Sequence, residues 1–135
     1  MNPLCMLDTN ICIHIMRHKR PEVRTRFDQF QTGQLVMSAI TYGELFFGVA
    51  KSGDRPRAEA QLQIFAEAVP PLPLGKDAAE KYGEIRALLE SQGRAIGNND
   101  IWIGAHALAL GITLATTNER EFRRIPQLTV ENWSK

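Results

Sequence analysis

The sequence lacks any long hydrophobic run. No segment approaches the ~20 apolar residues of a membrane-spanning helix, and Asp8 interrupts the apolar N-terminal stretch before the core of a signal peptide could form. Cysteine is scarce: Cys5 and Cys12 are the only two, and both lie in apolar surroundings. Buried free thiols in a reducing compartment are therefore a better interpretation than a disulfide. We expect a soluble, cytoplasmic protein with no membrane association.

An excess of charge of one sign is also missing. The chain has 16 Lys and Arg against 15 Asp and Glu, a formal net charge of +1, which by itself gives no argument for nucleic-acid binding. If several acids gather in one site, however, the remaining surface is more basic than the total suggests. The 135 residues contain no repeat, linker or low-complexity stretch. This length predicts one domain spanning residues 1–135.

Short apolar segments alternate with helical patterns along the chain. We expect strands at 4–7, 35–37, 72–74, 112–116 and 128–130. We expect helices after Asp8 with Thr9 or Asn10 as cap, from Pro21 to Gly33, over 39–50 behind a Ser38 cap, from Asp54 to Pro70, from a capping box of Asp77 and Glu80 to Gly93, and from Asp100 to Leu110, with a turn or short helix at 121–122. This alternation predicts a single three-layer α/β/α domain with a mostly parallel sheet.

Three acids stand out from this pattern. Asp8 ends the first buried strand, at the carboxyl edge where α/β sheets bind ligands. Asp100 opens a helix, and either Asp could simply cap the helix that follows it. Glu44 lies in a helix that is apolar on most sides, with no Lys or Arg within a helical turn. A surface position for Glu44 stays open, but a buried unpaired carboxylate would cost several kcal/mol and would need a cation.

Taken together, the three acids indicate a metal. Two carboxylates within ~4 Å of each other repel by about 4 kcal/mol at an effective dielectric constant of 20, so a fold tolerates the cluster only with a positive charge inside it. Sites made only of oxygen ligands suit Mg²⁺ or Mn²⁺. Such ions activate water and neutralise charge on a phosphodiester, which is hydrolytic phosphoryl chemistry.

Four segments carry a family resemblance: 6–10, 38–45, 96–107 and 116–122. In this order the sequence resembles the PIN-domain ribonucleases of the VapC type, toxins of bacterial type II toxin–antitoxin pairs. The resemblance implies a toxic, Mg²⁺- or Mn²⁺-dependent endoribonuclease that forms homodimers, is blocked by a cognate antitoxin, and cuts tRNA in the anticodon stem-loop. It implies that Asp8, Glu44 and Asp100 bind the metal and that Thr9 supports the site.

The sequence departs from the family at one position. Many relatives carry a fourth carboxylate where this chain has Asn118, which we include among the candidate catalytic residues. A neutral amide can ligate a metal or orient a water but brings no charge, so Glu121 is expected to substitute in part from a supporting position. We therefore predict one bound ion. Arg94 and Arg120 lie closest in sequence to this site and are candidates for RNA phosphate contacts.

Other interpretations stay open. A phosphatase with an aspartyl nucleophile would want a second acid two residues after Asp8, where the chain has Asn10. A non-catalytic RNA- or protein-binding module on the same fold is the other alternative. His14 and His18 have the spacing of a zinc pair but lack a third soft ligand. A last group of residues is expected in the core: Met6, Phe46, Phe47, Trp102 and His106.

Overall fold

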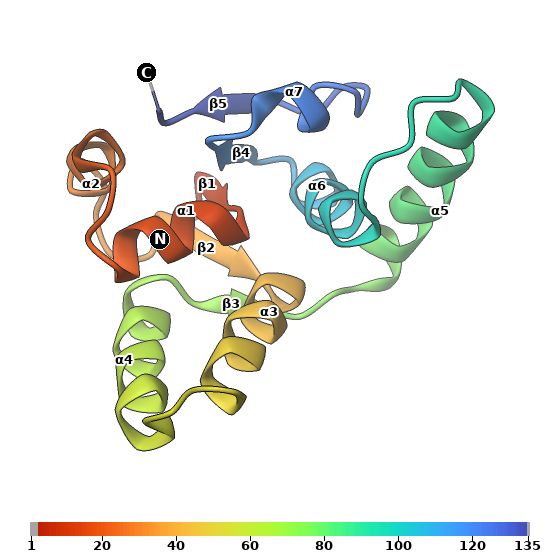
Figure 1. The fold of residues 1–135 in the computed structure, drawn as a ribbon. Coiled ribbons are helices and arrows are strands. Elements are labelled where there is room, and N and C mark those ends of the chain that lie inside the picture. The colour runs from red at the N-terminus through yellow and green to blue at the C-terminus, as the bar shows by residue number, and fades with distance from the viewer. Residues whose placement is uncertain (1–2, 135) are drawn as a thin grey trace.

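A computed structural model describes residues 3–134. Five parallel strands form one sheet in the order β3-β2-β1-β4-β5 (Figure 1). The strands are β1 (Cys5–Leu7), β2 (Leu35–Ser38), β3 (Pro71–Leu72), β4 (Thr113–Thr116) and β5 (Val130–Asn132). The central strands are short and buried, as expected for a parallel sheet covered on both faces.

Alternation along the strands divides the core into two layers. Successive side chains point to opposite faces of a sheet, so Leu7 and Met37 pack into one apolar cluster while Met6 and Val36 pack into the other. Cys5 and Cys12 both lie in the first cluster as free, buried thiols, as predicted. The sheet is therefore the middle layer of three, and the predicted α/β/α class is confirmed.

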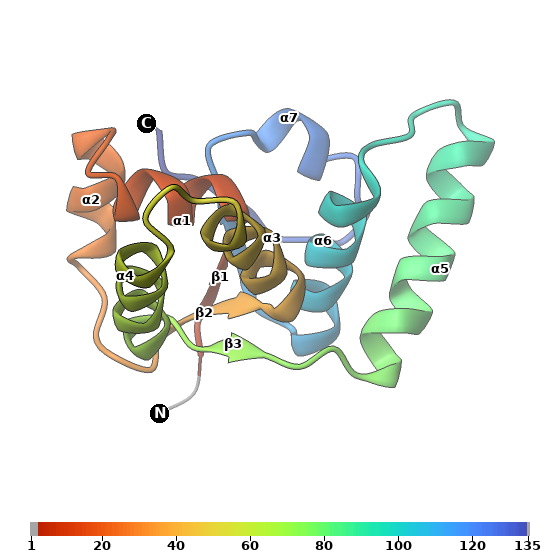
Figure 2. The same cartoon turned by 60° about the horizontal axis from the view of Figure 1, so that its bottom comes forward.

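Helices cover both faces (Figures 1 and 2). The cluster that contains Leu7 is closed by α1 (Thr9–Met16), α2 (Pro21–Phe27), α3 (Ala39–Ala50) and α4 (Arg55–Ala68). The opposite cluster is closed by α5 (Lys76–Ser91), α6 (Asn98–Leu110) and α7 (Glu119–Phe122). No helix within residues 3–134 is both long and apolar enough to cross a membrane.

Several predicted helix ends are wrong. Asp8, not Thr9 or Asn10, caps α1, because its extended backbone brings the carboxylate to the Ile11 N–H. The capping box at Asp77 does not form, because α5 already begins at Lys76 behind an extended Gly75 with no side-chain cap. Ser38 caps α3 as predicted, accepting a hydrogen bond from the Ile40 N–H at 3.1 Å.

Three other segments also differ from the sequence prediction. Helix α2 ends at Phe27 rather than running to Gly33. The Phe30 ring instead stacks on Trp133, with ring centroids 5.6 Å apart, so a tertiary contact takes the place of further helix. The last strand pairs with β4 over 130–132 rather than 128–130, and β3 covers 71–72 rather than 72–74.

Candidate active site at the carboxyl edge of the sheet

Asp8 lies where the direction of strand addition reverses. Strand β1 has β2 on one side and β4 on the other, so the chain winds away from β1 in both directions. The Asp8 N–H donates to the Ala115 carbonyl at 3.1 Å, which continues the β1–β4 pairing to the carboxyl end of both strands. The crevice at such a reversal is the usual ligand site of open α/β sheets.

The Asp8 carboxylate is 3% exposed and held through both oxygens. Oδ1 accepts a hydrogen bond from the Ile11 N–H at 2.9 Å, which is the helix cap, and Oδ2 accepts one from the Thr116 hydroxyl. Thr116 in turn accepts from the Asn118 N–H at 2.8 Å. The capping interpretation is therefore right for one oxygen, and each oxygen retains a lone pair for another partner.

Helix α3 brings Glu44 to the same place. The Thr9 hydroxyl donates to Glu44 Oε1 at 2.6 Å and lies 3.2 Å from the Thr41 hydroxyl, so Thr9 orients this carboxylate. The start of α3 is joined to α6 as well, because Ser38 Oγ lies 2.8 Å from Nδ1 of the buried His106. This link fixes the helix that carries Glu44 against the helix that carries Asp100.

Asp100 is the third residue of α6 and does not cap it. The cap position is Gly97, and no side chain makes a capping hydrogen bond there. The capping alternative is therefore wrong for Asp100. Burial raises the pKa of Asp100 to about 7, and the negative charges of Glu121, Asp8 and Glu44 act in the same direction, together with hydrogen bonding to Glu121.

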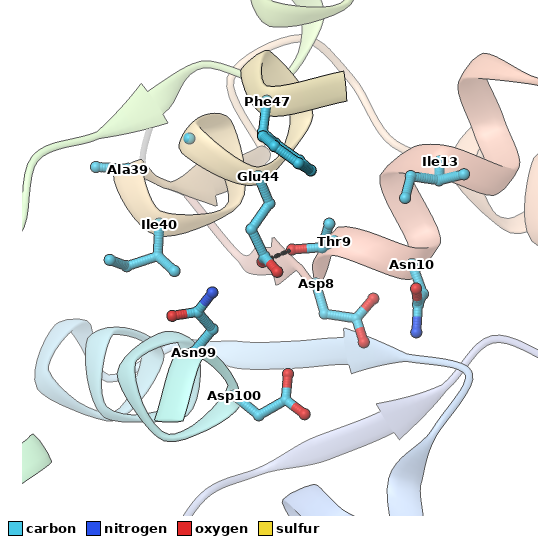
Figure 3. A pocket seen from close by; sticks show the side chains of 11 residues that line it. Asp8, Thr9, Asn10, Ile13, Ala39, Ile40, Glu44, Phe47, Asn99 and Asp100 are labelled. Carbon is cyan, nitrogen blue, oxygen red and sulfur yellow. Dashed lines mark hydrogen bonds between the residues drawn. The ribbon is translucent and has the colours of Figure 1, made fainter. Parts of the chain in front are cut away.

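The end of β1 and helices α1, α3 and α6 form an open cleft of about 720 Å³. Figure 3 shows the side chains of Asp8, Glu44 and Asp100 pointing into it from the end of β1, from α3 and from the first turn of α6. The rest of the lining contains both polar and apolar residues: Thr9, Asn10, Ile13, Ala39, Ile40, Gly43, Phe47 and Asn99. The three acids predicted from the sequence are thus brought together from segments that are far apart in the chain.

The charge of the cleft suits a cation. Burial raises the pKa of Asp8 to about 6, a shift opposed by the hydrogen bonds from Thr116 and Ile11 and supported by the charge of Glu44. Within residues 3–134, no Lys, Arg or His side chain forms an ion pair with any of the three acids. Carboxylate, hydroxyl and amide oxygens are the donors that Mg²⁺ and Mn²⁺ prefer. The donor set and its uncompensated charge therefore fit a divalent ion.

The side chains are not yet gathered around one point. In the part of the chain that the structure describes, no three His, Cys, Asp or Glu side chains stand close enough to hold one ion together. Each acid instead has its own hydrogen-bond partners: Asp8 is held by Ile11 and Thr116, Glu44 by Thr9, and Asp100 by Glu121.

Glu121 and Asn118, the two residues considered for the fourth position, are placed differently by the fold. Glu121 is half-buried and is the strongest charged influence on Asp100. Asn118 is exposed and contributes its backbone N–H to Thr116. Glu121, rather than Asn118, is therefore the fourth acidic or amide group that reaches the cluster. Arg94 and Arg120 are exposed and lie outside the residues that line the cleft.

Two contributors were missed at the sequence level. Thr116 holds Asp8, and its position one residue after the Leu7–Ala115 register pair could have signalled this contact. Phe47 was expected in the core but is 65% exposed at the cleft wall. The other core predictions fit better, since Met6 and His106 are buried and Phe46 and Trp102 are half-buried.

Comparison with known proteins agrees with this geometry. The PIN domain family matches residues 5–128. The chain is 40% identical over 129 residues to the tRNA(fMet)-specific endonuclease VapC of Shigella flexneri, covering 96% of this chain and 97% of that protein. It is 40% identical over 128 residues to Ribonuclease VapC2 of Haemophilus influenzae, covering 95% and 96%.

Solved structures show the same similarity. VapBC-1 from nontypeable Haemophilus influenzae matches with a TM-score of 0.90 at 38% identity, covering 98% of this chain and 99% of that one. VapBC2 from Rickettsia felis, bound to a DNA fragment from their promoter, matches with a TM-score of 0.86 at 36% identity, covering 96% and 98%. The chain belongs to the PIN-domain family and, within it, to the VapC ribonucleases.

Proposed function

We propose that this protein is the toxin of a toxin–antitoxin pair and acts as a divalent-metal-dependent endoribonuclease. The observation that carries the proposal is the group of three carboxylates at the carboxyl edge of the sheet. Asp8 and Glu44 are held by neutral donors, and none of the three is paired with a cation of residues 3–134. The names of the relatives support ribonuclease activity.

Each residue of the cluster has a proposed role. Asp8, Glu44 and Asp100 hold one Mg²⁺ or Mn²⁺, which supplies an activated water and neutralises charge on the phosphodiester. Thr116 and Thr9 orient Asp8 and Glu44 through the hydrogen bonds described above.

A fourth acid completes the cluster in our proposal. Glu121 lies against Asp100 and adds the negative charge that Asn118 does not provide. Burial and the neighbouring acids raise the pKa of Asp100 in the metal-free protein, and a bound ion would favour its deprotonated form. Asn118 then supports the site mainly through its backbone contact with Thr116.

The proposed substrate is tRNA, cut in the anticodon stem-loop. One relative is named a tRNA(fMet)-specific endonuclease, and single-stranded loops are the part of a folded RNA whose bases proteins can reach. Arg94 and Arg120 remain our candidates for phosphate contacts, since both are exposed.

The proposed partner is a cognate antitoxin. Solved relatives include VapBC-1 of Haemophilus influenzae and a toxin–antitoxin complex from Klebsiella pneumoniae, and a cytoplasmic ribonuclease needs an inhibitor to spare its host. A homodimer, implied by the family, remains a prediction as well. Expression without the antitoxin should arrest growth, and expression of the Asp100→Asn variant should not.

Cleavage of a tRNA transcript tests the central claim. Asp8→Asn keeps both the size and the capping ability of the side chain but removes its charge. We expect a loss of at least about 10²-fold in rate, because positioning and charge stabilisation are lost together. The matched control is Glu131→Gln, which removes a carboxylate outside the cleft and should cut at the parent rate. Full activity of Asp8→Asn would refute the assignment.

A further inference from the structure

We propose that Phe47 is a stacking platform for one unpaired base of the RNA, in the nucleotide that adjoins the bond to be cut. The inference rests on the proposed ribonuclease function and adds a base-binding subsite to it. Three observations carry it: the exposure of the ring, its place on the wall of the cleft, and the residues one turn before and after it, in α3 and at its C-cap.

The exposure of Phe47 is not explained by packing. The ring is 65% exposed, whereas the neighbouring Phe46 is half-buried against the core and lies 6.1 Å from the Tyr42 ring, centroid to centroid. Helix α3 faces the core through Leu45 and Val49. Phe47 lies instead on the side of Glu44 and lines the same cleft (Figure 3).

Phe47 stands in the middle of a row of residues spaced by four. Lys51 follows it in the row, with Nζ 4.9 Å from the ring centroid, and covers one face of the ring. Gly43 precedes it, and a Cβ added there would meet nothing within 4 Å. Helical side chains lean toward the N-terminus of the helix, so a larger residue at position 43 would lie beside the ring. Glycine leaves that space open.

This open space has the chemistry of a base-binding slot. Single-stranded RNA is held by aromatic rings that stack on its bases, because every base has a π-face, and by cations that follow its backbone. Phe47 supplies the ring and Lys51 supplies a cation just beyond it. Asp8, Glu44 and Asp100 repel phosphate unless an ion is bound among them, so the aromatic wall offers attraction that does not depend on charge.

The place of the slot determines which base it takes. Phe47 follows Glu44 by three residues, which is about 4.5 Å along the helix axis. A base stacked on Phe47 therefore belongs to a nucleotide next to the carboxylates. We expect the identity of the base to matter little and its presence to matter greatly.

Three variants separate stacking from other contributions. Phe47→Trp keeps an aromatic face, Phe47→Leu keeps apolar area without one, and Gly43→Leu fills the open space. Gly83→Leu is the matched control, because Gly83 is an exposed glycine of helix α5 with equally open space and lies outside the residues that line the cleft. Each is tested on tRNA anticodon stem-loops that carry one abasic nucleotide in turn at every loop position.

Two measurements are made on each combination of variant and RNA. The first is kcat/KM with Mg²⁺. The second is the quenching of 2-aminopurine placed in the loop, measured in chelator, where no cleavage occurs. Phe47→Leu and Gly43→Leu should lower kcat/KM about 5- to 150-fold, the range for loss of one base stack, and should abolish the quenching. Phe47→Trp should restore the quenching that Phe47→Leu loses, and Gly83→Leu should resemble the parent. One abasic position should cause the same loss in the parent and no further loss in Phe47→Leu.

The two proposals fail in different ways. Suppose that the parent cuts RNA and that Phe47→Leu quenches 2-aminopurine and cuts RNA as well as Phe47→Trp does. That result would overturn the stacking role alone. The same holds if Phe47→Leu weakens only antitoxin binding. A parent that quenches 2-aminopurine through Phe47 but never cuts would overturn the nuclease and leave the base-binding slot standing.

Discussion

Two acidic sites in this small protein are held very differently by the fold. Glu131, on the edge strand β5, accepts hydrogen bonds from the Arg26 guanidinium and, at 2.9 Å, from Trp133 Nε1. The Arg26 guanidinium also lies over the Phe30 and Trp133 rings, 5.0 and 5.8 Å from their centroids. At this corner the chain supplies its own cation.

In the cleft, Asp8 and Glu44 receive hydrogen bonds only from neutral donors. Asp8 is held by a hydroxyl and an amide, and Glu44 by the Thr9 hydroxyl. Such donors fix the direction of a carboxylate but leave its charge in place. The contrast indicates that Glu131 joins α2 to β5, whereas the cleft is arranged for a cation that comes from outside the chain. Three predictions can break or sharpen this contrast.

Metal binding should give the largest difference in stability. Saturating Mg²⁺ at a hundredfold excess over its dissociation constant should stabilise the parent by about 2.7 kcal/mol. Asp100→Asn should gain little, because it removes a ligand. In chelator the variant should be at least as stable as the parent, since it relieves repulsion and loses no cap.

Urea melts with chelator and with Mg²⁺ measure both quantities. Glu131→Gln is the control, and it should gain as much from Mg²⁺ as the parent does. Equal destabilisation of Asp100→Asn in both conditions would remove Asp100 from the metal site.

The dependence of stability on pH gives the next effect. The folded-state pKa values of Asp8 and Asp100, about 6 and about 7, lie above the ordinary value of 3.8. Between pH 4 and pH 7 the folded state therefore binds more protons than the unfolded state, and in chelator its stability falls as the pH rises. Both groups contribute to this fall, and solvent around the half-buried Asp100 reduces its share relative to that of the buried Asp8.

Asp100→Asn should flatten the upper part of this curve, near pH 7, and Mg²⁺ should flatten it in the parent at the same pH. Urea melts at a series of pH values measure the slope. Stability that rises from pH 4 to pH 7 in chelator would show that the acids are paired after all.

The convergence of the acids could be predicted because it depends on topology. A buried strand followed by Asp8 places that residue at the carboxyl edge, and a parallel sheet brings Glu44 and the first turn of α6 to the same edge. Helix ends were less predictable. Asp8 and Asp77 are both good caps by residue type. Asp8 caps α1 because it is the last extended residue before that helix, whereas Asp77 already lies inside α5, which begins at Lys76.

The details of the site depend on contacts that no local pattern contains. Glu121 faces Asp100 because its neighbour Phe122 is buried in the core and so sets the orientation of α7. The contact between His106 and Ser38 spans 68 residues. In an apolar helix, Phe46 and Phe47 are equivalent by composition, and only the packing of Leu45 and Val49 decides that Phe47 points to the cleft.

The smallest effect is expected at the paired corner. Glu131→Gln keeps the shape and the acceptor oxygen for Trp133 and removes only the charge that faces Arg26. The two side chains are 40% and 38% exposed, so solvent screens much of their attraction, and we expect a loss of about 0.5–1 kcal/mol in the free energy of unfolding. Urea melts should give the same loss with chelator and with Mg²⁺, and RNA cleavage should be unchanged. A change in the cleavage rate, or in the stabilisation by Mg²⁺, would mean that this corner is coupled to the cleft. The two acidic sites would then not be independent.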